Sequence, residues 1–254
     1  GSILAEVAIV KSLNWKVEFL STGYHSHSLE ELIEITKQVF QLYGEKVWLN
    51  YGYMSQSYIE ALSPYSYGVN ASIESINHEI RKISTPSKPI EKFLETFDYA
   101  KGLKRSITIV VGLGETLEDV PKLHDFIKEY KIDRITFYAL IPHKGLSYNS
   151  GPSTDDYCEW IARTRIAFPK LNIIAGTRLS NLDEIHLILK SGANSLTKFQ
   201  AIKHFNSPYA LKIEKEIEKA GRAFTGSFTN MPKIEISNSH IRNYVKQMEK
   251  PKLV

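Results

Sequence analysis

Short runs of β-branched and aromatic residues alternate along this chain with stretches in which apolar residues recur with a helical period. Runs of the first kind predict buried strands, and stretches of the second kind predict amphipathic helices. The predicted strands occupy residues 15–21, 46–52, 67–74, 106–112, 133–141, 171–177 and 193–199. The predicted helices occupy residues 3–13, 28–42, 55–62, 87–101, 116–130, 153–167, 181–190 and 207–220. The regular alternation predicts a series of βα units.

Two of the predicted strands, ITIVVG and ITFYALI, are apolar almost throughout. Strands that are covered on both faces have this pattern, so we expect a parallel sheet. Seven βα units agree better with a (β/α)8 TIM-type barrel that lacks one strand than with a doubly wound sheet. Residues 3–13 are then a helix whose preceding strand is missing from the chain. We therefore predict an α/β barrel over residues 3–221 and a C-terminal extension over 222–254, with a short helix at 239–249.

Composition and charge exclude several classes of function. The net charge is +4 and the isoelectric point is near 8.9, with acidic residues interleaved among the basic ones. This mild balance does not predict nucleic-acid binding. No apolar run reaches the roughly 18 residues that a membrane-spanning helix needs. The single cysteine, Cys158, excludes a disulfide framework and a cysteine metal cluster, and fits a cytoplasmic protein.

In parallel barrels the chemistry lies at the C-terminal ends of the strands, so the residues that follow each strand are the candidates. The GLGET turn at 112–116 allows a ligand to approach its backbone closely, but it also has the features of a plain helix cap at Thr116. Glu74 ends a strand and is either a ligand for hydroxyl or ammonium groups or a solvated strand end. Lys198 is either an imine-forming amine or a charge at the rim. The histidines lack the spacing of a zinc site.

The order of these segments resembles that of the radical SAM enzymes, in particular the biotin synthase-like branch. The stretches EFLSTGY, NASIES, PIEKFLETF, VVGLGETLED, YALIPHKG and ILKSGANSLTKF carry the resemblance, which covers residues 3–221. It implies a barrel that binds S-adenosylmethionine (SAM) at the C-terminal ends of its strands. It also implies a [4Fe–4S] cluster that cleaves SAM to a 5′-deoxyadenosyl radical.

The resemblance assigns SAM-binding roles residue by residue. The strand end at Ser21, Thr22 and Gly23 would offer its backbone to the methionine amino group. Ser72 and Glu74 would contact ribose and methionine, and Lys92 would hold the SAM carboxylate as a point charge. The apolar and glycine positions that would pack on the adenine are Val110, Gly112 and Ile141.

The substrate is expected to enter the mouth of the barrel beside a set of polar and aromatic side chains: Tyr51, Tyr53, Tyr138, Thr177, Arg178 and Lys198. The inner strands carry no cysteine, which argues against the sulfur insertion of biotin synthase itself. A cofactor maturase, such as the one for the guanylylpyridinol cofactor of [Fe]-hydrogenase, agrees better. A small-molecule substrate and an electron donor such as a ferredoxin or flavodoxin are the implied partners.

One departure from the family is large, because the first strand and its CxxxCxxC-type cluster loop are missing. We expect the cluster ligands in an N-terminal segment outside this chain, and the alternative is a degenerate family member. Two other functions stay open at this stage. One is a barrel lyase or aldolase that uses Lys198 as an imine-forming amine, and the other is a non-catalytic module that binds a nucleoside.

Overall fold

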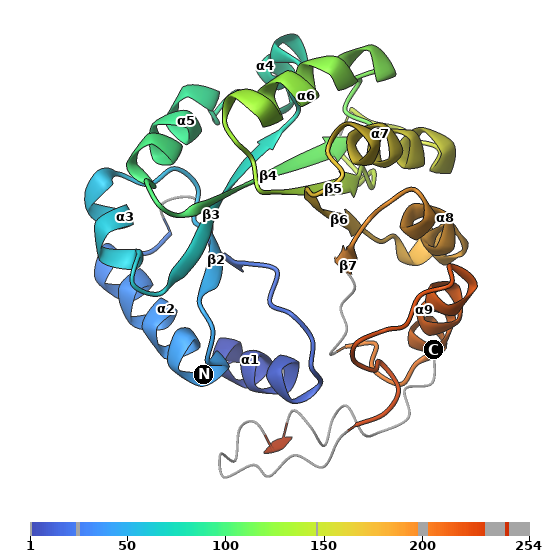
Figure 1. Ribbon diagram of the computed structural model, residues 1–254, viewed down its shortest axis with the longest axis horizontal. Coiled ribbons are helices and arrows are strands. Elements are labelled where there is room, and N and C mark those ends of the chain that lie inside the picture. The colour runs from blue at the N-terminus through green and yellow to red at the C-terminus, as the bar shows by residue number, and fades with distance from the viewer. Residues whose placement is uncertain (1, 24–25, 146, 198–202, 232–241, 244–254) are drawn as a thin grey trace.

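Seven parallel strands form a single curved sheet in the computed structural model, which describes residues 2–23, 26–145, 147–197, 203–231 and 242–243. The strands are β1 (Leu20–Ser21), β2 (Val47–Asn50), β3 (Ser66–Glu74), β4 (Lys104–Val111), β5 (Arg134–Ala139), β6 (Asn172–Gly176) and β7 (Ser195–Thr197). Their order in the sheet is their order in the chain, and every neighbouring pair is parallel. Figure 1 shows that the sheet curls into most of a ring. The predicted α/β barrel with a parallel sheet is confirmed.

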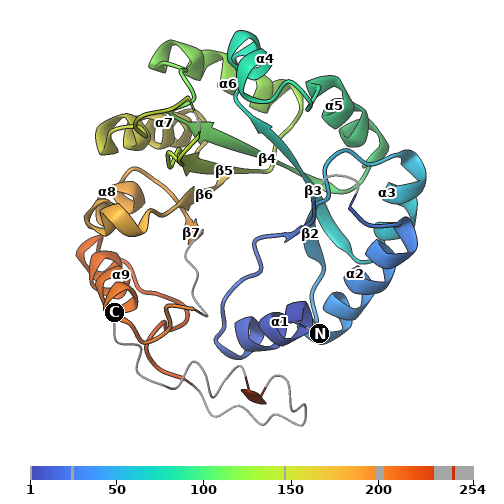
Figure 2. The ribbon, with the colours of Figure 1, turned by 180° about the vertical axis from the view of Figure 1, so that it is seen from behind.

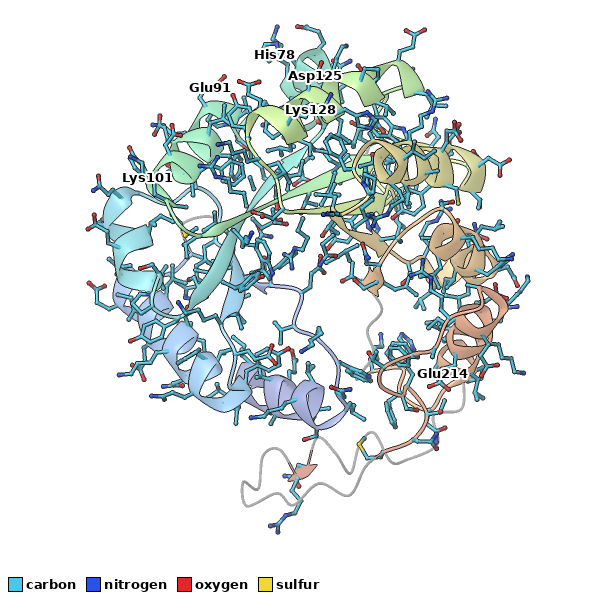
Figure 3. All side chains as sticks on the ribbon, in the orientation of Figure 1. His78, Glu91, Lys101, Asp125, Lys128 and Glu214 are labelled. Carbon is cyan, nitrogen blue, oxygen red and sulfur yellow. The ribbon has the colours of Figure 1, made fainter. Side chains whose placement is uncertain are left out.

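The helices lie outside the ring of strands, as Figures 1 and 2 show from opposite sides. They are α1 (Ser2–Ser12), α2 (Leu29–Tyr43), α3 (Gln56–Leu62), α4 (His78–Ser84), α5 (Ile90–Tyr99), α6 (Val120–Glu129), α7 (Thr154–Ala167), α8 (Ile185–Lys190) and α9 (Pro208–Lys219), with 3-10 turns η1 (Leu117–Asp119) and η2 (Leu179–Glu184). Helix α2 begins at a capping box formed by Ser28 and Glu31 and ends at Gly44, whose φ is 85°. Charged side chains such as Glu91 and Asp125 point outward (Figure 3).

The strands divide their side chains between an apolar outer face and a largely polar inner face. On β4, Ile107, Ile109 and Val111 are buried in the core between the sheet and the helices. The alternate residues Ser106 and Thr108 face inward, where they bond Arg134 and Asn70 of the neighbouring strands. This alternation follows from the two-residue period of a strand. The interior of the barrel therefore presents hydrogen-bonding groups.

The edge strands β1 and β7 face each other across the ring, and segments from the two ends of the chain meet beside them. The ring of Trp15 lies 5.2 Å from that of Phe228 and 6.3 Å from that of Phe205, centroid to centroid. Asn14 Nδ2 donates to the carbonyl of Thr225 at 2.8 Å. Residues 222–231 thus pack on the barrel, and a domain boundary at 221 stays a prediction.

Several predicted boundaries differ from the structure. The first strand is two residues long instead of seven, because residues 15–19 run irregularly beside the edge of the sheet. Helix α4, between β3 and α5, was missed, although Asn77 caps it through bonds to two backbone N–H groups. The helices predicted at 116–130 and 181–190 each begin with a 3-10 turn. The helix predicted at 239–249 lies almost wholly outside the described residues.

A candidate SAM site at the rim of the barrel

The strand ends bring most of the predicted site residues to one edge of the sheet. Ser72 and Glu74 end β3, Val110 and Gly112 lie at the end of β4, and Ile141 follows β5. Ser21 ends β1, where Asn50 Nδ2 donates to its hydroxyl at 3.4 Å. Parallel pairing places these ends side by side, with Val110 opposite Tyr138. These residues therefore lie along one rim of the barrel, and their SAM-binding roles stay a prediction.

The GLGET turn holds itself closed through one side chain. Leu113 N–H donates to Glu115 Oε2 at 3.0 Å, and Gly112 N–H donates to Oε1 of the same carboxylate. Burial raises the pKa of Glu115, while these backbone donors counter the shift. Gly112 has a φ of 109°, and a Cβ there would lie 2.9 Å from Pro152 Cδ. The turn therefore has the features of a structural cap, with Pro152 packed against its glycine, and a close approach by a ligand stays a prediction.

Glu74 is paired, and its partner is Lys88. Lys88 Nζ lies 2.9 Å from Glu74 Oε1. Arg81 of α4, which is 6% exposed, donates from Nη2 to the carbonyl of Lys88 and so fixes that loop. Lys92 instead points to solvent from α5 and pairs with Glu95 at 2.9 Å. The lysine paired with Glu74 is thus Lys88, four positions before Lys92, and the role predicted for Lys92 stays a prediction.

A carboxylate that the sequence analysis did not single out joins the loops after β3 and β4. Asp119 accepts bonds from Asn77 Nδ2 at 3.1 Å, from Lys122 Nζ at 2.7 Å and from the N–H of Thr116 at 3.2 Å. Burial alone would raise the pKa of Asp119, but these donors outweigh it and hold the pKa below its usual value. Asp119 fixes the two rim loops relative to each other. Its place three residues after the cap Thr116 was the available signal.

Two predicted substrate residues, Tyr51 and Tyr53, follow β2 and lie beside the loop after β1. Tyr51 is buried, and its hydroxyl shares a 2.9 Å hydrogen bond with Thr36 of α2. Burial raises the pKa of this tyrosine. Tyr51, Tyr53, Thr22 and Gly23 line a small cavity of about 160 Å³. Tyr51 therefore fills space between strand and helix, and the cavity adjoins the loop predicted to contact methionine.

Tyr138 points into the barrel and contacts Glu18, which the sequence analysis also overlooked. The Tyr138 hydroxyl donates to Glu18 Oε1 at 3.2 Å, and Thr136 Oγ1 donates to the same oxygen at 3.0 Å. Thr197 of β7 donates to the other carboxylate oxygen. Burial, followed by the Glu18 charge, raises the pKa of Tyr138, so its phenol stays protonated at neutral pH. Glu18 is therefore a hub that links β5 and β7.

Thr177 and Arg178 are held by protein contacts after β6. The buried Thr177 donates from Oγ1 to the carbonyl of Thr197 at 3.0 Å. Arg178 forms a two-point ion pair with the buried Glu184, with Nε 2.8 Å from Oε1, and its Nη1 donates to the carbonyl of Pro152 at 3.0 Å. This guanidinium joins the loops after β5 and β6. The sixth predicted substrate residue, Lys198, lies outside the described residues.

The residues that are present do not fit an iron–sulfur cluster. The chain has one cysteine, Cys158, which lies on α7, where burial raises the pKa of its thiol. Across the part of the chain that the structure describes, no three His, Cys, Asp or Glu side chains gather as metal ligands. In the same part, no helix has the length and apolar character needed to cross a membrane.

Comparison with known families decides the relationship. A model of the radical SAM superfamily matches residues 2–127, and a model of the biotin and thiamin synthesis-associated domain matches residues 136–221. The chain belongs to the radical SAM superfamily. This is a superfamily of enzymes, and the second match agrees with the biotin synthase-like branch. The resemblance inferred from the order of strands and turns is confirmed.

One curated relative is similar to most of this chain. An uncharacterized protein of Methanocaldococcus jannaschii is 37% identical over 234 residues, which are 91% of this chain and 64% of that protein. The chain thus spans less than two thirds of the length of that relative. The activity, substrate and partners of the protein to which this chain belongs are therefore proposals.

Two solved structures of superfamily members share the fold. Methylornithine synthase (PylB) has a TM-score of 0.67 at 18% identity, over 98% of this chain and 73% of that one. The [FeFe]-hydrogenase maturase HydG from Carboxydothermus hydrogenoformans has a TM-score of 0.62 at 14% identity, over 98% of this chain and 58% of that one. At these identities the likeness concerns the fold alone.

Proposed function

We propose that the protein is a radical SAM enzyme that binds SAM across the rim formed by the ends of β1, β3, β4 and β5. The match to the superfamily supports this function. The observation that carries it is the Glu74–Lys88 pair at the end of β3, next to the glycine turn after β4. A carboxylate and an ammonium group side by side complement the hydroxyl, amino and carboxylate groups of SAM.

Within this proposal, Ser72 and Glu74 contact ribose and methionine, and Lys88 replaces Lys92 as the partner of the SAM carboxylate. Arg81 supports Lys88 by holding its backbone carbonyl. Lys92 is exposed and already paired with Glu95, so the same role would require its side chain to leave that pair and turn inward. The backbone around Ser21, Thr22 and Gly23 binds the methionine amino group.

The adenine is proposed to pack on Val110, Gly112 and Ile141. Gly112 has no side chain, and this lets the loop at Pro152 pack directly against the turn, with Pro152 Cδ 2.9 Å from the position of an added Cβ. Glu115 accepts from the N–H groups of Gly112 and Leu113, so these two donors are not available to the ring. Apolar contacts with Val110 and Ile141 would then favour the purine.

A [4Fe–4S] cluster supplies the electron that cleaves SAM in this superfamily. We propose that its thiolate ligands belong to residues outside this chain, since Cys158 alone does not meet the requirement. We further propose a role in cofactor biosynthesis or maturation, of the kind found for [Fe]-hydrogenase. A ferredoxin or flavodoxin would serve as reductant.

The test uses the full-length protein, reconstituted anaerobically with iron and sulfide and supplied with SAM and a low-potential reductant. We expect a brown protein that releases 5′-deoxyadenosine. Glu74→Gln should reduce that release at least tenfold, whereas Glu95→Gln, which alters only the exposed partner of Lys92, should leave it unchanged. A full-length protein that binds neither iron nor SAM would overturn the proposal.

A further inference from the structure

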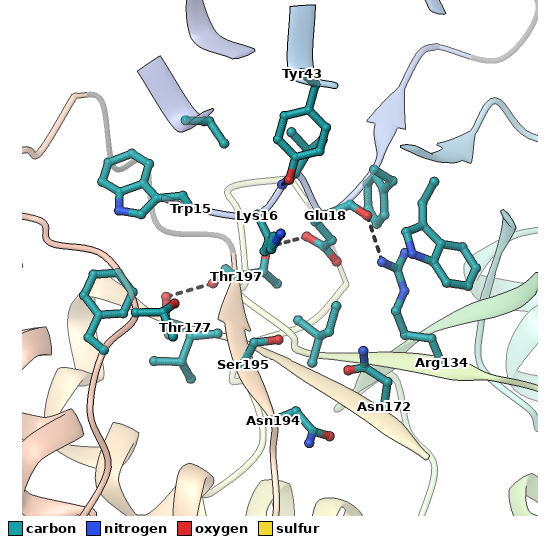
Figure 4. A pocket seen from close by; sticks show the side chains of 18 of the residues that line it. Trp15, Lys16, Glu18, Tyr43, Arg134, Asn172, Thr177, Asn194, Ser195 and Thr197 are labelled. Carbon is teal, nitrogen blue, oxygen red and sulfur yellow. Dashed lines mark hydrogen bonds between the residues drawn. The ribbon is translucent and has the colours of Figure 1, made fainter. Parts of the chain in front are cut away.

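The interior of the barrel opens into a cavity of about 1280 Å³ that extends from the inner face of the sheet to the gap between β1 and β7. Among the described charged residues that line it, Glu18 and Arg134 alone are not exposed to solvent. The two come from different segments, one just before β1 and one at the start of β5. Figure 4 shows Arg134, Asn172 and Ser195 around the space next to Glu18.

Arg134 is held in place but has one unused donor. Its Nε donates to Ser106 Oγ at 3.1 Å, its Nη1 donates to the carbonyl of Glu18 at 2.8 Å, and its guanidinium lies 3.9 Å from the ring centroid of Trp48. Its Nη2 has no hydrogen-bond partner, although the residue is only 3% exposed. An unsatisfied buried donor costs about 1–3 kcal/mol, more for a charged group. The free edge of the guanidinium is therefore suited to a carboxylate.

The Glu18 carboxylate can accept a further hydrogen bond from a cationic donor. It accepts bonds from three neutral hydroxyls, those of Thr136, Tyr138 and Thr197. Arg134 contacts the backbone carbonyl of Glu18 instead of its carboxylate, so the two opposite charges attract each other without a direct ion pair. The three hydroxyls fix the direction of the carboxylate, which has room for a further donor. Glu18 is half-buried and has no direct ion pair with Arg134, so a cation bound at its carboxylate would be favoured.

We propose that this cavity binds a zwitterionic small molecule, with its carboxylate at Arg134 and its ammonium group at Glu18. The proposal deepens the proposed function and rests on it, because the molecule held inside the barrel is the substrate of the SAM-derived radical. Glu18 and Arg134 then each gain a directly bound partner of opposite charge. A dianion would be repelled by Glu18, and a simple monoanion would leave Glu18 without a counter-ion.

Burial lowers the pKa of Arg134 to about 10, and the Glu18 charge limits the shift. Arg134 therefore stays cationic at neutral pH and retains its affinity for a carboxylate. Lys16, Lys46 and Glu45 line the outer end of the same cavity but are exposed to solvent. Charges in that position are hydrated and screened by salt, so they contribute little to selectivity.

The test measures binding to the full-length protein with SAM and without reductant, so that no turnover occurs. The probes are ω-amino acids from glycine to 5-aminovalerate, and the single-charge probes are valerate and pentylamine. Titration calorimetry measures the dissociation constant of each. One ω-amino acid of matching length should bind at least tenfold more tightly than both single-charge probes. Equal binding of all probes, or none, would overturn the inference.

Two variants, each of which removes one charge, test which residue binds which end of the zwitterion. In Glu18→Gln, the best ω-amino acid should bind no more than about threefold more tightly than valerate does. In Arg134→Gln, the same ω-amino acid should bind about as tightly as pentylamine does. Glu45→Gln is the matched control from the same cavity and should change neither value. Thermal melts verify folding, and Arg134→Met, which also removes the charge, replaces Arg134→Gln if that variant unfolds. Unchanged selectivity in folded Glu18 and Arg134 variants would contradict the assignment.

Release of 5′-deoxyadenosine separates this inference from the proposed function. A protein that cleaves SAM but binds no zwitterion would overturn only the inference. A protein that binds the zwitterion but neither binds nor cleaves SAM would overturn the proposed function, and the cavity would then belong to another activity.

Discussion

The Glu18 carboxylate accepts a hydrogen bond from the Thr197 hydroxyl, although 179 positions separate the two residues in the chain. The bond joins the segment before β1 to the last strand of the sheet. Because β1 and β7 are not paired with each other, this contact and the Trp15–Phe228 contact hold the two edges in position. Removal of the Thr197–Glu18 hydrogen bond should therefore lower the free energy of unfolding of the whole barrel.

Thr197→Val tests that contact. The variant keeps the shape of the side chain and removes one of three hydroxyl donors to Glu18, so the free energy of unfolding should fall by about 1–2 kcal/mol. Urea unfolding at neutral pH measures the change. Thr225→Val, at an exposed position whose side chain has no recorded hydrogen bond, should change it by less than about 0.5 kcal/mol. Equal effects at the two positions would show that the Glu18 hub does not stabilise the fold.

Lys88→Met and Lys92→Met separate the two candidates for the SAM carboxylate. Loss of a charge-assisted contact costs about 1.5–3 kcal/mol, so Lys88→Met should raise the dissociation constant of SAM at least tenfold. Lys92→Met should leave it unchanged, because Lys92 is exposed and pairs with Glu95. Equilibrium dialysis with the full-length protein gives both constants. The reverse order would restore Lys92 to the role that the resemblance gave it.

Gly112→Ala should destabilise the protein more than Gly102→Ala. Both glycines have positive φ, 109° and 84°, and so share the backbone cost of an added Cβ. A Cβ at Gly112 would also meet Pro152 Cδ at 2.9 Å, whereas nothing lies within 4 Å at Gly102. We expect losses of about 3 and 1 kcal/mol respectively, measured by thermal unfolding. Similar losses would mean that the Pro152 loop moves aside freely.

The contacts of Asp119 predict that the free energy of unfolding falls at acid pH. Its pKa is lower in the folded protein than the unfolded value near 3.8, so its contribution is present above that value and is lost as pH falls through the folded pKa. Asp119→Asn removes this contribution. The stability difference between wild type and variant should therefore be greatest near neutral pH and should shrink below about pH 4.

Asp125→Asn is the control for that pH series, because the Asp125 side chain is 80% exposed. Its stability should follow the wild-type curve throughout. A constant difference between wild type and Asp119→Asn from pH 7 to pH 3 would contradict the assigned role of Asp119, since a neutral loss of packing has no such pH dependence.

The fold was predictable because it depends on periodic signals. The apolar runs of β4 and β5 required a sheet covered on both faces, and the amphipathic helices between strands required parallel connections. The end of the sheet was less predictable. Residues 15–19 have the composition of a strand, yet only Leu20 and Ser21 pair with β2, because pairing depends on a neighbour and not on composition.

The site was predictable in position more than in detail. Strand ends located Ser72, Glu74 and Gly112 at one rim, since a parallel sheet brings all its C-terminal ends together. Contacts between residues distant in the sequence could not be predicted from the sequence. Lys88 reaches Glu74 through a loop, Glu115 turns back on its own backbone, and Glu18 crosses the barrel to β5 and β7. No local pattern reports such contacts.

The agreement between spatial and sequential order of the strands has a consequence for how the chain acquires its structure. Each pairing spans a single βα unit, so the loops that must close are of similar, modest length and each new unit adds to an existing template. Synthesis from the N-terminus proceeds in the same direction, which favours stepwise growth on the ribosome. Glu18 meets its β5 partners first, whereas Thr197 and Phe228 reach Glu18 and Trp15 only when residues 197–228 have emerged, so joining of the two edges follows pairing of the strands.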